Sequence, residues 1–227
     1  MTDITARLAD LQSRVATACT QCGRDPSEVR LLAVSKTKPL DLIEDAIAAG
    51  QDDFGENYLQ DALPKTEALP KATWHFIGAI QSNKTRDIAN HFDWVHSVAS
   101  EKVARRLSEQ RDPALGPLKV LIQVNTSQES QKSGVAPEQA LPLAKYLANL
   151  DNLVAAGLMT IPAASEDPSQ QRRPFQMLRE TRDHIVDTAG LPDFQHLSMG
   201  MTGDFETAIT EGSTWIRIGT AIFGSRS

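Results

Sequence analysis

The chain has 227 residues, two cysteines and a formal net charge of −6, and its isoelectric point is about 5.4. Its length allows one or two domains with a sizeable core. The acidic balance excludes the basic face of a typical nucleic-acid-binding domain, and no stretch approaches the roughly 18 uncharged apolar residues of a membrane span. Residues 1–14 lack the apolar segment of a signal peptide, so we expect a cytoplasmic protein.

The first predicted element is an amphipathic helix over residues 3–22, where apolar residues recur at helical spacing until Gly23. The cysteines, Cys19 and Cys22, lie at its end in the order CTQC. A redox pair with this spacing is expected where a strand gives way to a helix, and structural zinc needs about four ligands. We therefore predict two ordinary thiols and no metal site.

Strand-like and helix-like segments alternate along the rest of the chain. Strands are predicted at 30–35, 53–55, 73–77, 94–98, 119–125, 153–160, 194–198 and 214–218. Helices are predicted at 40–49, 57–68, 82–91, 100–111, 137–149, 168–189 and 203–212, with a short remnant at 221–225. A long loop after the sixth strand is predicted over residues 162–174, which are rich in proline, serine and glutamine.

Eight such units predict an α/β fold, a closed (β/α)8 barrel of the TIM type that forms a single domain over 1–227 and carries an extra amino-terminal helix. A doubly wound open sheet is the alternative, but no GxGxxG motif opens a helix. In a barrel, ligand-binding groups lie in the loops that follow the strands. These loops therefore hold the candidate site.

Lys36 follows the apolar run LLAVS of the first strand. With its stem in an apolar layer, desolvation would disfavour the ammonium form and free an amine for imine chemistry. The alternative is a lysine whose charged end extends to solvent.

Polar residues also mark the second and third strands. Asn57 follows FGE and is either an amide directed at the barrel mouth or a helix cap. His75 lies inside the third strand, where a lone histidine is most often a hydrogen-bonded core residue. Lys84, in the loop after that strand, is either part of the site or a solvated charge.

The loops after the last two strands carry glycines and hydroxyl groups. Ser198 and Gly200 belong to LSMGMTGD, and Gly219 and Thr220 belong to IRIGTA. These loops form the recurring phosphate site of the barrel, because glycines expose backbone N–H groups and hydroxyls add donors. The alternative is helix capping by Ser198 and Thr202.

Arg217 lies in the apolar strand WIRIG and faces opposite to its two isoleucine neighbours. An arginine directed into a barrel needs an acceptor. That acceptor is either a carboxylate in an internal salt bridge or a pyridine nitrogen, for which arginine is a known partner in pyridoxal phosphate sites. A guanidinium would keep that nitrogen unprotonated and weaken the ring as an electron sink.

Six stretches then carry a resemblance over nearly the whole chain: LLAVSKTKP, FGENYLQDA, WHFIGAIQSNK, GLMTIP, LSMGMTGDFETAI and WIRIGTAIFG. In this order they resemble the pyridoxal phosphate homeostasis family, the single-domain relatives of the alanine racemase barrel, and WHFIGAIQSNK is the most specific of them. The resemblance implies that pyridoxal 5'-phosphate is held as a Schiff base on Lys36 and is buffered or delivered in vitamin B6 homeostasis.

The resemblance also implies a role for each site residue. Arg217 would face the pyridine nitrogen, and Asn57 would lie near the ring hydroxyl. The phosphate would be bound by Ser198, Gly219 and Thr220, with Met199 and Gly200 beside it. Thr202 stands where serine is commoner in the family, and the hydroxyl is kept. The loop SQESQKSGV also matches and makes Lys132 a candidate for transient contact with the cofactor during loading or release.

Three functions fit a Schiff-base lysine beside a phosphate site. An amino-acid racemase needs a second acid–base group. Related racemases use a tyrosine from an added domain or a partner subunit. Tyr58 is the sole local candidate here, since Tyr146 falls in an outer helix. A phosphosugar aldolase would leave Arg217 without a role. We favour a monomeric binding protein, not an enzyme, that passes its cofactor to apo-enzymes or salvage enzymes.

Overall fold

The computed structural model describes residues 3–127, 133–163, 165 and 167–224. Eight parallel strands form a closed barrel in which each strand pairs with its neighbours in chain order. They are β1 (Arg30–Val34), β2 (Asp53–Glu56), β3 (Thr73–Phe76), β4 (Trp94–Val98), β5 (Leu118–Gln123), β6 (Leu153–Met159), β7 (His196–Ser198) and β8 (Trp215–Ile218). β8 closes the ring against β1, with Arg30 opposite Trp215 and Leu32 opposite Arg217. The predicted α/β barrel is confirmed.

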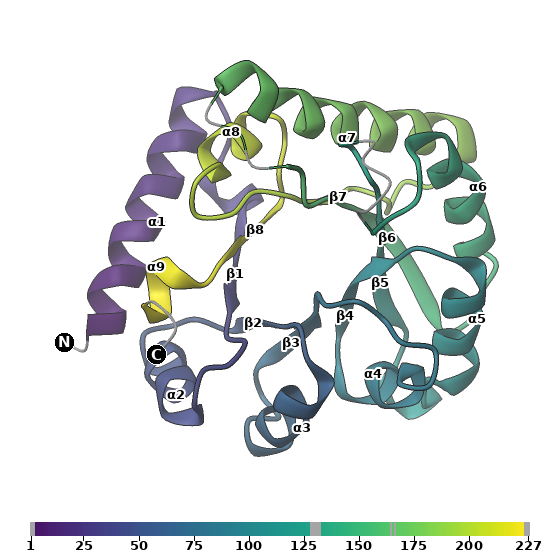
Figure 1. Cartoon of the computed structure of the whole chain (residues 1–227), viewed down its shortest axis with the longest axis horizontal. Helices are drawn as coiled ribbons and strands as arrows, with labels where there is room; N and C mark the ends of the chain where they lie inside the picture. The colour runs from purple at the N-terminus through teal and green to yellow at the C-terminus, as the bar shows by residue number, and fades with distance from the viewer. Residues whose placement is uncertain (1–2, 128–132, 164, 166, 225–227) are drawn as a thin grey trace.

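A helix follows each strand, and Figure 1 shows these helices as a ring around the strands. They are α2 (Leu40–Ala48), α3 (Leu59–Ala68), α4 (Thr85–His91), α5 (Glu101–Gln110), α6 (Pro137–Leu147), α7 (Pro168–Ala189), α8 (Phe205–Thr210) and α9 (Thr220–Phe223). Two short 3-10 turns, η1 (Pro26–Glu28) and η2 (Pro113–Leu115), were not predicted.

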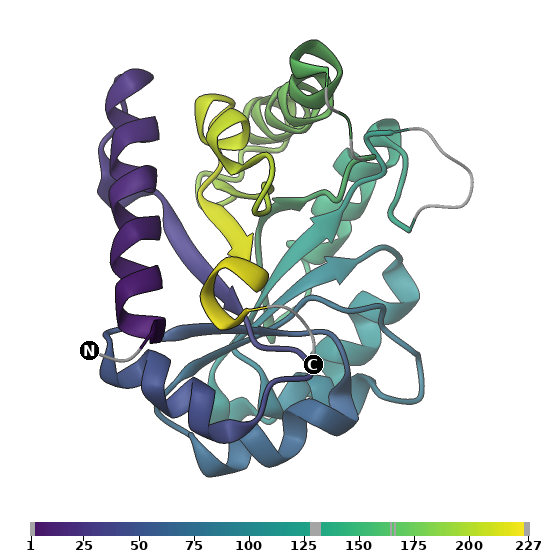
Figure 2. The same ribbon diagram turned by 60° about the vertical axis from the view of Figure 1, so that its left-hand side comes forward.

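The predicted amino-terminal helix is α1 (Asp3–Gln21). Its buried face consists of Ile4, Leu8, Leu11, Val15, Ala18 and Cys19. The helix contacts α2, α8 and α9 and stands beside β1 and β8 in Figure 2. Because α9 has only four residues, α1 supplies the apolar cover that this side of the barrel would otherwise lack.

Several predicted boundaries differ from the structure, and local hydrogen bonds explain two of the differences. The loop after β6 does not extend to residue 174, because α7 begins at Pro168. Asp167 accepts the Ser169 N–H at 2.9 Å and Pro168 occupies the first helical position, which together start the helix. β7 begins at His196, two residues later than predicted, because the Gln195 N–H donates to the Asp193 carbonyl in a turn.

The barrel interior has its own small apolar cluster, formed by Leu32, Trp94, Leu121, Ala156, Met159 and Trp215. The rings of Trp94 and Trp215 lie 5.6 Å apart. The Lys119 ammonium lies 4.9 Å from Trp94, and the Arg30 guanidinium lies 4.5 Å from Trp215. These residues fill part of the barrel interior around the two tryptophans.

Three further predictions can be compared with the described residues. Cys19 and Cys22 are both free thiols, as predicted. In the described ranges, no group of three or more potential ligands could hold a metal ion. No helix in that part of the chain is long and apolar enough to cross a membrane.

Candidate functional site

Lys36 lies in a turn directly after β1, at the carboxyl end of the barrel, and is partly buried. The next residue, Thr37, has a φ of 61°, which a β-branched residue rarely adopts. The Lys38 N–H donates to the Ser35 carbonyl at 3.0 Å and closes the turn. Backbone in such a conformation clusters at binding sites, so this turn is a candidate site on geometric grounds alone.

A buried ion pair fixes the backbone that precedes Lys36. Nζ of Lys65, from α3, lies 2.7 Å from Oε1 of Glu56 and 2.9 Å from the Ser35 carbonyl oxygen. The Ser35 hydroxyl donates to the same Glu56 oxygen at 2.7 Å. Burial raises the pKa of Glu56, and the hydrogen bond from Lys65 opposes this shift. The turn that carries Lys36 therefore starts from a rigid base.

Gly219, directly after β8, brings a second loop to the Lys36 turn. A Cβ at Gly219 would lie 3.1 Å from the carbonyl oxygen of Val34, two residues before Lys36. The next residue, Thr220, is exposed. A glycine at this position thus lets the loops after β1 and β8 share one edge of the barrel.

The loop after β7 adjoins this edge as well. Gly200 has a φ of 96°, and a Cβ there would lie 2.7 Å from Cβ of Ala208. Its carbonyl oxygen accepts the backbone N–H of Arg217 at 3.0 Å. Met199 is fully buried and Thr202 is exposed. The glycines and hydroxyls predicted to bind an anion are therefore gathered by two neighbouring loops.

Arg217 points into the barrel and is 4 % exposed. Its guanidinium donates to the Ser198 hydroxyl at 2.9 Å and to the Thr160 carbonyl oxygen at 2.9 Å. Burial lowers the pKa of Arg217 to about 10, opposed by the charge of Asp204, so the side chain remains charged at neutral pH. No carboxylate of the described residues forms a salt bridge with Arg217, which removes the internal-salt-bridge alternative.

Ser198 is fully buried, and its hydroxyl also lies 2.9 Å from Nδ1 of His96. The Ser198 hydroxyl thus forms its hydrogen bonds inside the barrel, whereas the other groups predicted to bind phosphate lie in the loops. The helix-capping alternative for Ser198 and Thr202 is wrong, since α8 has Asp204 at its N-cap position.

Asn57 follows β2 at the same end of the barrel. Its Oδ1 is buried and has no hydrogen-bond partner among the described residues. The alternative that Asn57 caps a helix is wrong, because the N-cap of α3 is Tyr58. Gly78, after β3, packs so closely that a Cβ there would lie 1.9 Å from the Asn57 carbonyl oxygen. A buried acceptor of this kind suits a ligand that brings a donor.

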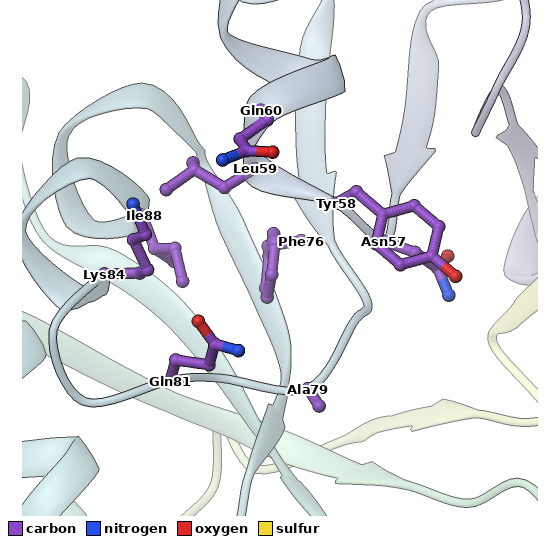
Figure 3. A pocket seen from close by; sticks show the side chains of 9 residues that line it. All are labelled: Asn57, Tyr58, Leu59, Gln60, Phe76, Ala79, Gln81, Lys84 and Ile88. Atoms are coloured by element: carbon purple, nitrogen blue, oxygen red, sulfur yellow. The ribbon is translucent and has the colours of Figure 1, made fainter.

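Lys84 lines a side cavity of about 270 Å³ between α3 and α4. Figure 3 shows Gln60, Gln81 and Lys84 around the space and Phe76 behind it. Tyr58 is 58 % exposed, and Figure 3 shows it with Asn57 on one side of the lining. Lys84 and Asn57 therefore share this cavity.

The prediction that His75 is a hydrogen-bonded core residue is confirmed. Its Nδ1 lies 3.0 Å from Nε2 of His96 and its Nε2 lies 3.2 Å from Oδ1 of Asp53. Burial lowers the pKa of both histidines, most strongly that of His96, where neighbouring positive charge adds to the effect. His96 was not singled out from the sequence, although it stands in a strand with the alternation WVHSV.

Two candidates from the sequence, a tyrosine and a lysine, lie outside this site or outside the described residues. Tyr146 lies in the outer helix α6, as predicted, and is partly buried. Lys132 lies outside the described residues.

Comparisons with known proteins agree on one family. The sequence model of the alanine racemase N-terminal domain matches residues 7–227. The pyridoxal phosphate homeostasis protein of Pseudomonas aeruginosa is 52 % identical over 229 residues, which cover 100 % of this chain and 97 % of that protein. Its counterpart in Vibrio cholerae is 48 % identical over 232 residues, covering 100 % and 98 %. The structure of PipY from Synechococcus elongatus with PLP bound is similar with a TM-score of 0.85 and 35 % identity, covering 98 % of this chain and 100 % of PipY.

Proposed function

Since the chain belongs to the pyridoxal phosphate homeostasis protein family, built on the alanine racemase N-terminal domain, we propose that it binds pyridoxal 5'-phosphate at the carboxyl end of its barrel and serves vitamin B6 homeostasis. The observation that carries the proposal is the gathering of Lys36, Gly219 and Gly200 on one edge, with Arg217 below them inside the barrel. Relatives of this chain are named as homeostasis proteins and not as enzymes.

The residues present fit this cofactor. Its phosphate needs N–H and hydroxyl donors at a place where the backbone can approach closely, which Gly219, Thr220 and Gly200 supply without a basic surface. Its ring nitrogen needs a donor, and Arg217 has five N–H groups, of which two donate to described protein acceptors. Its ring hydroxyl is a donor that suits the unpaired Oδ1 of Asn57.

The amine of Lys36 would hold the cofactor covalently. The aldehyde of pyridoxal phosphate forms an imine with such an amine, with loss of one water and no further reactant. The rigid, strained turn at Lys36 and Thr37 would aim the amine at that carbon. Met199 and Gly200 would lie beside the phosphate, and Ser198 would contribute to its binding while its hydroxyl bonds Arg217.

The electrostatics favour holding the cofactor over using it. A guanidinium cannot give up its proton at neutral pH, so the ring nitrogen opposite Arg217 would stay unprotonated and the ring would withdraw electrons weakly. The racemase alternative also needs an acid–base group on the opposite face. Tyr58 lies at the side cavity and is 58 % exposed, and Tyr146 lies in α6, so neither supports that alternative.

The test is the visible spectrum of purified protein with added pyridoxal phosphate. We expect an absorption band of the bound cofactor, its fixation by borohydride, and a modified peptide that contains Lys36. Lys36→Ala should lose the band, whereas Lys84→Ala, at the side cavity, should keep it. The absence of a band in wild-type protein, or fixation at another lysine, would overturn the proposal. Substantial turnover of D- or L-alanine would overturn the carrier role in favour of the racemase.

The remaining features of the proposal concern the whole protein. We propose a single-domain monomer that acts in the cytoplasm and passes pyridoxal phosphate to apo-enzymes or salvage enzymes. Gene disruption should then disturb B6 vitamer and amino-acid pools, and unaltered pools would contradict the role. Sedimentation of the protein with bound cofactor measures the oligomeric state, for which we expect one copy.

A further inference from the structure

We propose that a chain of buried hydrogen bonds across the barrel interior orients Arg217 toward the cofactor ring, with His96, His75 and Asp53 as positioning residues. This inference rests on the proposed function, since it concerns the same site. We call the set the interior chain; its members, from the carboxyl to the amino end of the barrel, are Arg217, Ser198, His96, His75, Asp53 and Arg30.

The interior chain is continuous. The Ser198 hydroxyl lies 2.9 Å from Arg217 and 2.9 Å from Nδ1 of His96. The two histidine rings meet at 3.0 Å, and His75 reaches Asp53 at 3.2 Å. It spans six strands, each of which contributes one member: β1, β2, β3, β4, β7 and β8, in a ring where β1 and β8 are neighbours.

The two ends of the interior chain have opposite hydrogen-bonding requirements. Arg217 can only donate, so the Ser198 oxygen must accept from it. Asp53 is paired with Arg30 at 2.8 Å, and as a carboxylate it can only accept. These two ends set the direction of every bond between them.

The proton positions follow from that direction. The Ser198 hydroxyl donates to Nδ1 of His96, Nε2–H of His96 donates to Nδ1 of His75, and Nε2–H of His75 donates to Asp53. Each imidazole then carries one proton and is neutral, and each polar atom in the sequence has a partner. The opposite order would leave the Ser198 hydroxyl proton without an acceptor in the interior chain.

Aromatic packing holds the two imidazoles in place. The His75 ring is stacked on Trp94 at 5.6 Å with an interplanar angle of 3°, and meets Trp215 edge-on at 4.7 Å. His96 packs edge-on against His75 at 5.1 Å. The tryptophans therefore restrict the His75 ring, and His75 in turn restricts His96, the residue that bonds the Ser198 hydroxyl.

The consequence is a guanidinium with a set orientation. Arginine has a long, flexible side chain, and one acceptor at each of two nitrogens defines its plane. Ser198 supplies one of these acceptors and the Thr160 carbonyl supplies the other. A Ser198 hydroxyl held by His96 therefore directs the remaining N–H groups of Arg217, although His96, His75 and Asp53 do not touch the cofactor site.

The first test uses wild-type protein without cofactor. Nitrogen-15 NMR of labelled imidazole rings distinguishes the two neutral tautomers and the charged form. We expect both His75 and His96 as neutral Nε2–H tautomers at pH 7.5. An Nδ1–H tautomer or a charged ring at either position would overturn the interior chain, whatever the protein binds.

The second test measures the cofactor in loaded protein. Ser198→Ala and His96→Leu should weaken binding of pyridoxal phosphate about tenfold, as expected for one lost hydrogen bond to a charged group. Both should also shift the nitrogen-15 resonance of the cofactor ring. His196→Gln is the matched control, because His196 lies in the same interior against Trp94, with ring centroids 5.1 Å apart, but outside the interior chain.

The outcomes separate this inference from the proposed function. No binding of pyridoxal phosphate by wild-type protein would refute the proposed function. Binding by wild type with an unchanged affinity and ring-nitrogen resonance in Ser198→Ala and His96→Leu would refute only the inference. An equal shift in His196→Gln would also refute it, since any buried histidine would then have the same effect.

Discussion

Nζ of Lys65 lies 2.7 Å from Oε1 of Glu56, and both side chains are buried beneath the turn that carries Lys36. The pair joins α3 to the ends of β1 and β2, since Lys65 also bonds the Ser35 carbonyl. Breaking such a pair leaves a buried charge without compensation. The stability of the site's first loop is thus linked to a helix on the outside of the barrel.

Lys65→Met should therefore lower the free energy of unfolding by about 3–5 kcal/mol in urea titrations at pH 7.5. The second Glu56 oxygen already has no partner among the described residues, so little else can compensate. Lys71→Met, at an exposed position, should stay within about 0.5 kcal/mol of wild type. A loss in Lys65→Met as small as that of the control would mean that the pair is not a structural anchor.

The loop after β7 gives a second prediction. Gly200→Ala places a Cβ 2.7 Å from Ala208 at a φ of 96°, whereas at Gly203 a Cβ meets nothing within 4 Å and φ is not positive. We expect Gly200→Ala to lower stability by about 1–3 kcal/mol and to weaken pyridoxal phosphate binding, measured by absorbance titration. Gly203→Ala should change neither. Equal effects of the two variants would show that the loop tolerates a side chain at both positions.

Features that depend on local sequence patterns could be predicted for this protein, whereas contacts between distant residues could not. The barrel was predictable because its strands are buried on both faces and alternate with amphipathic helices. The places of Lys36 and Arg217 in the barrel were predictable, because Lys36 follows an apolar strand and Arg217 interrupts one. The bond between His96 and Ser198 joins residues 102 positions apart, and only the register of a closed barrel brings them together.

The same distinction explains why two helix-capping alternatives are wrong. Asn57 has the residue type of a helix cap, but the turn after β2 puts Tyr58 at the N-cap position. Ser198 also has the residue type of a cap, but strand alternation directs its side chain into the barrel, where its hydroxyl bonds Arg217 and His96. In both cases the residue type suited a cap, and tertiary structure decided the position or direction of the side chain.

Buried histidines predict how stability depends on pH. Burial lowers the pKa of His196 to about 4, with neighbouring positive charges adding to the effect. The unfolded chain binds a proton near pH 6.5 and the folded chain does not, so stability is lost as pH falls from about 6.5 toward 4. His196→Gln should reduce the slope of unfolding free energy against pH by up to about 1.4 kcal/mol per unit between pH 6 and 5.

The control for that slope is His184→Gln, at an exposed position of α7, which should retain the wild-type pH dependence. The two variants are compared by urea unfolding at pH 7.5, 6.0 and 5.0. A wild-type slope in His196→Gln would contradict the neutral state of this partly buried ring.

The last prediction concerns the electronic state of the bound cofactor. Arg217→Glu replaces a group that can only donate with one that can hold the ring nitrogen in its protonated form, and a protonated ring withdraws electrons more strongly. We expect a slow reaction of the bound cofactor with added L-alanine, which is monitored through the visible spectrum of the cofactor.

Asp204 lies close enough for its charge to act on Arg217 and has a pKa raised by burial. Without the guanidinium this pKa should rise further, which limits the number of new negative charges. Arg217→Met is the matched control, because it removes the guanidinium but provides no acid, and it should lose affinity without gaining reactivity. Equal reactivity in the Glu and Met variants would show that Arg217 binds the ring without controlling its protonation.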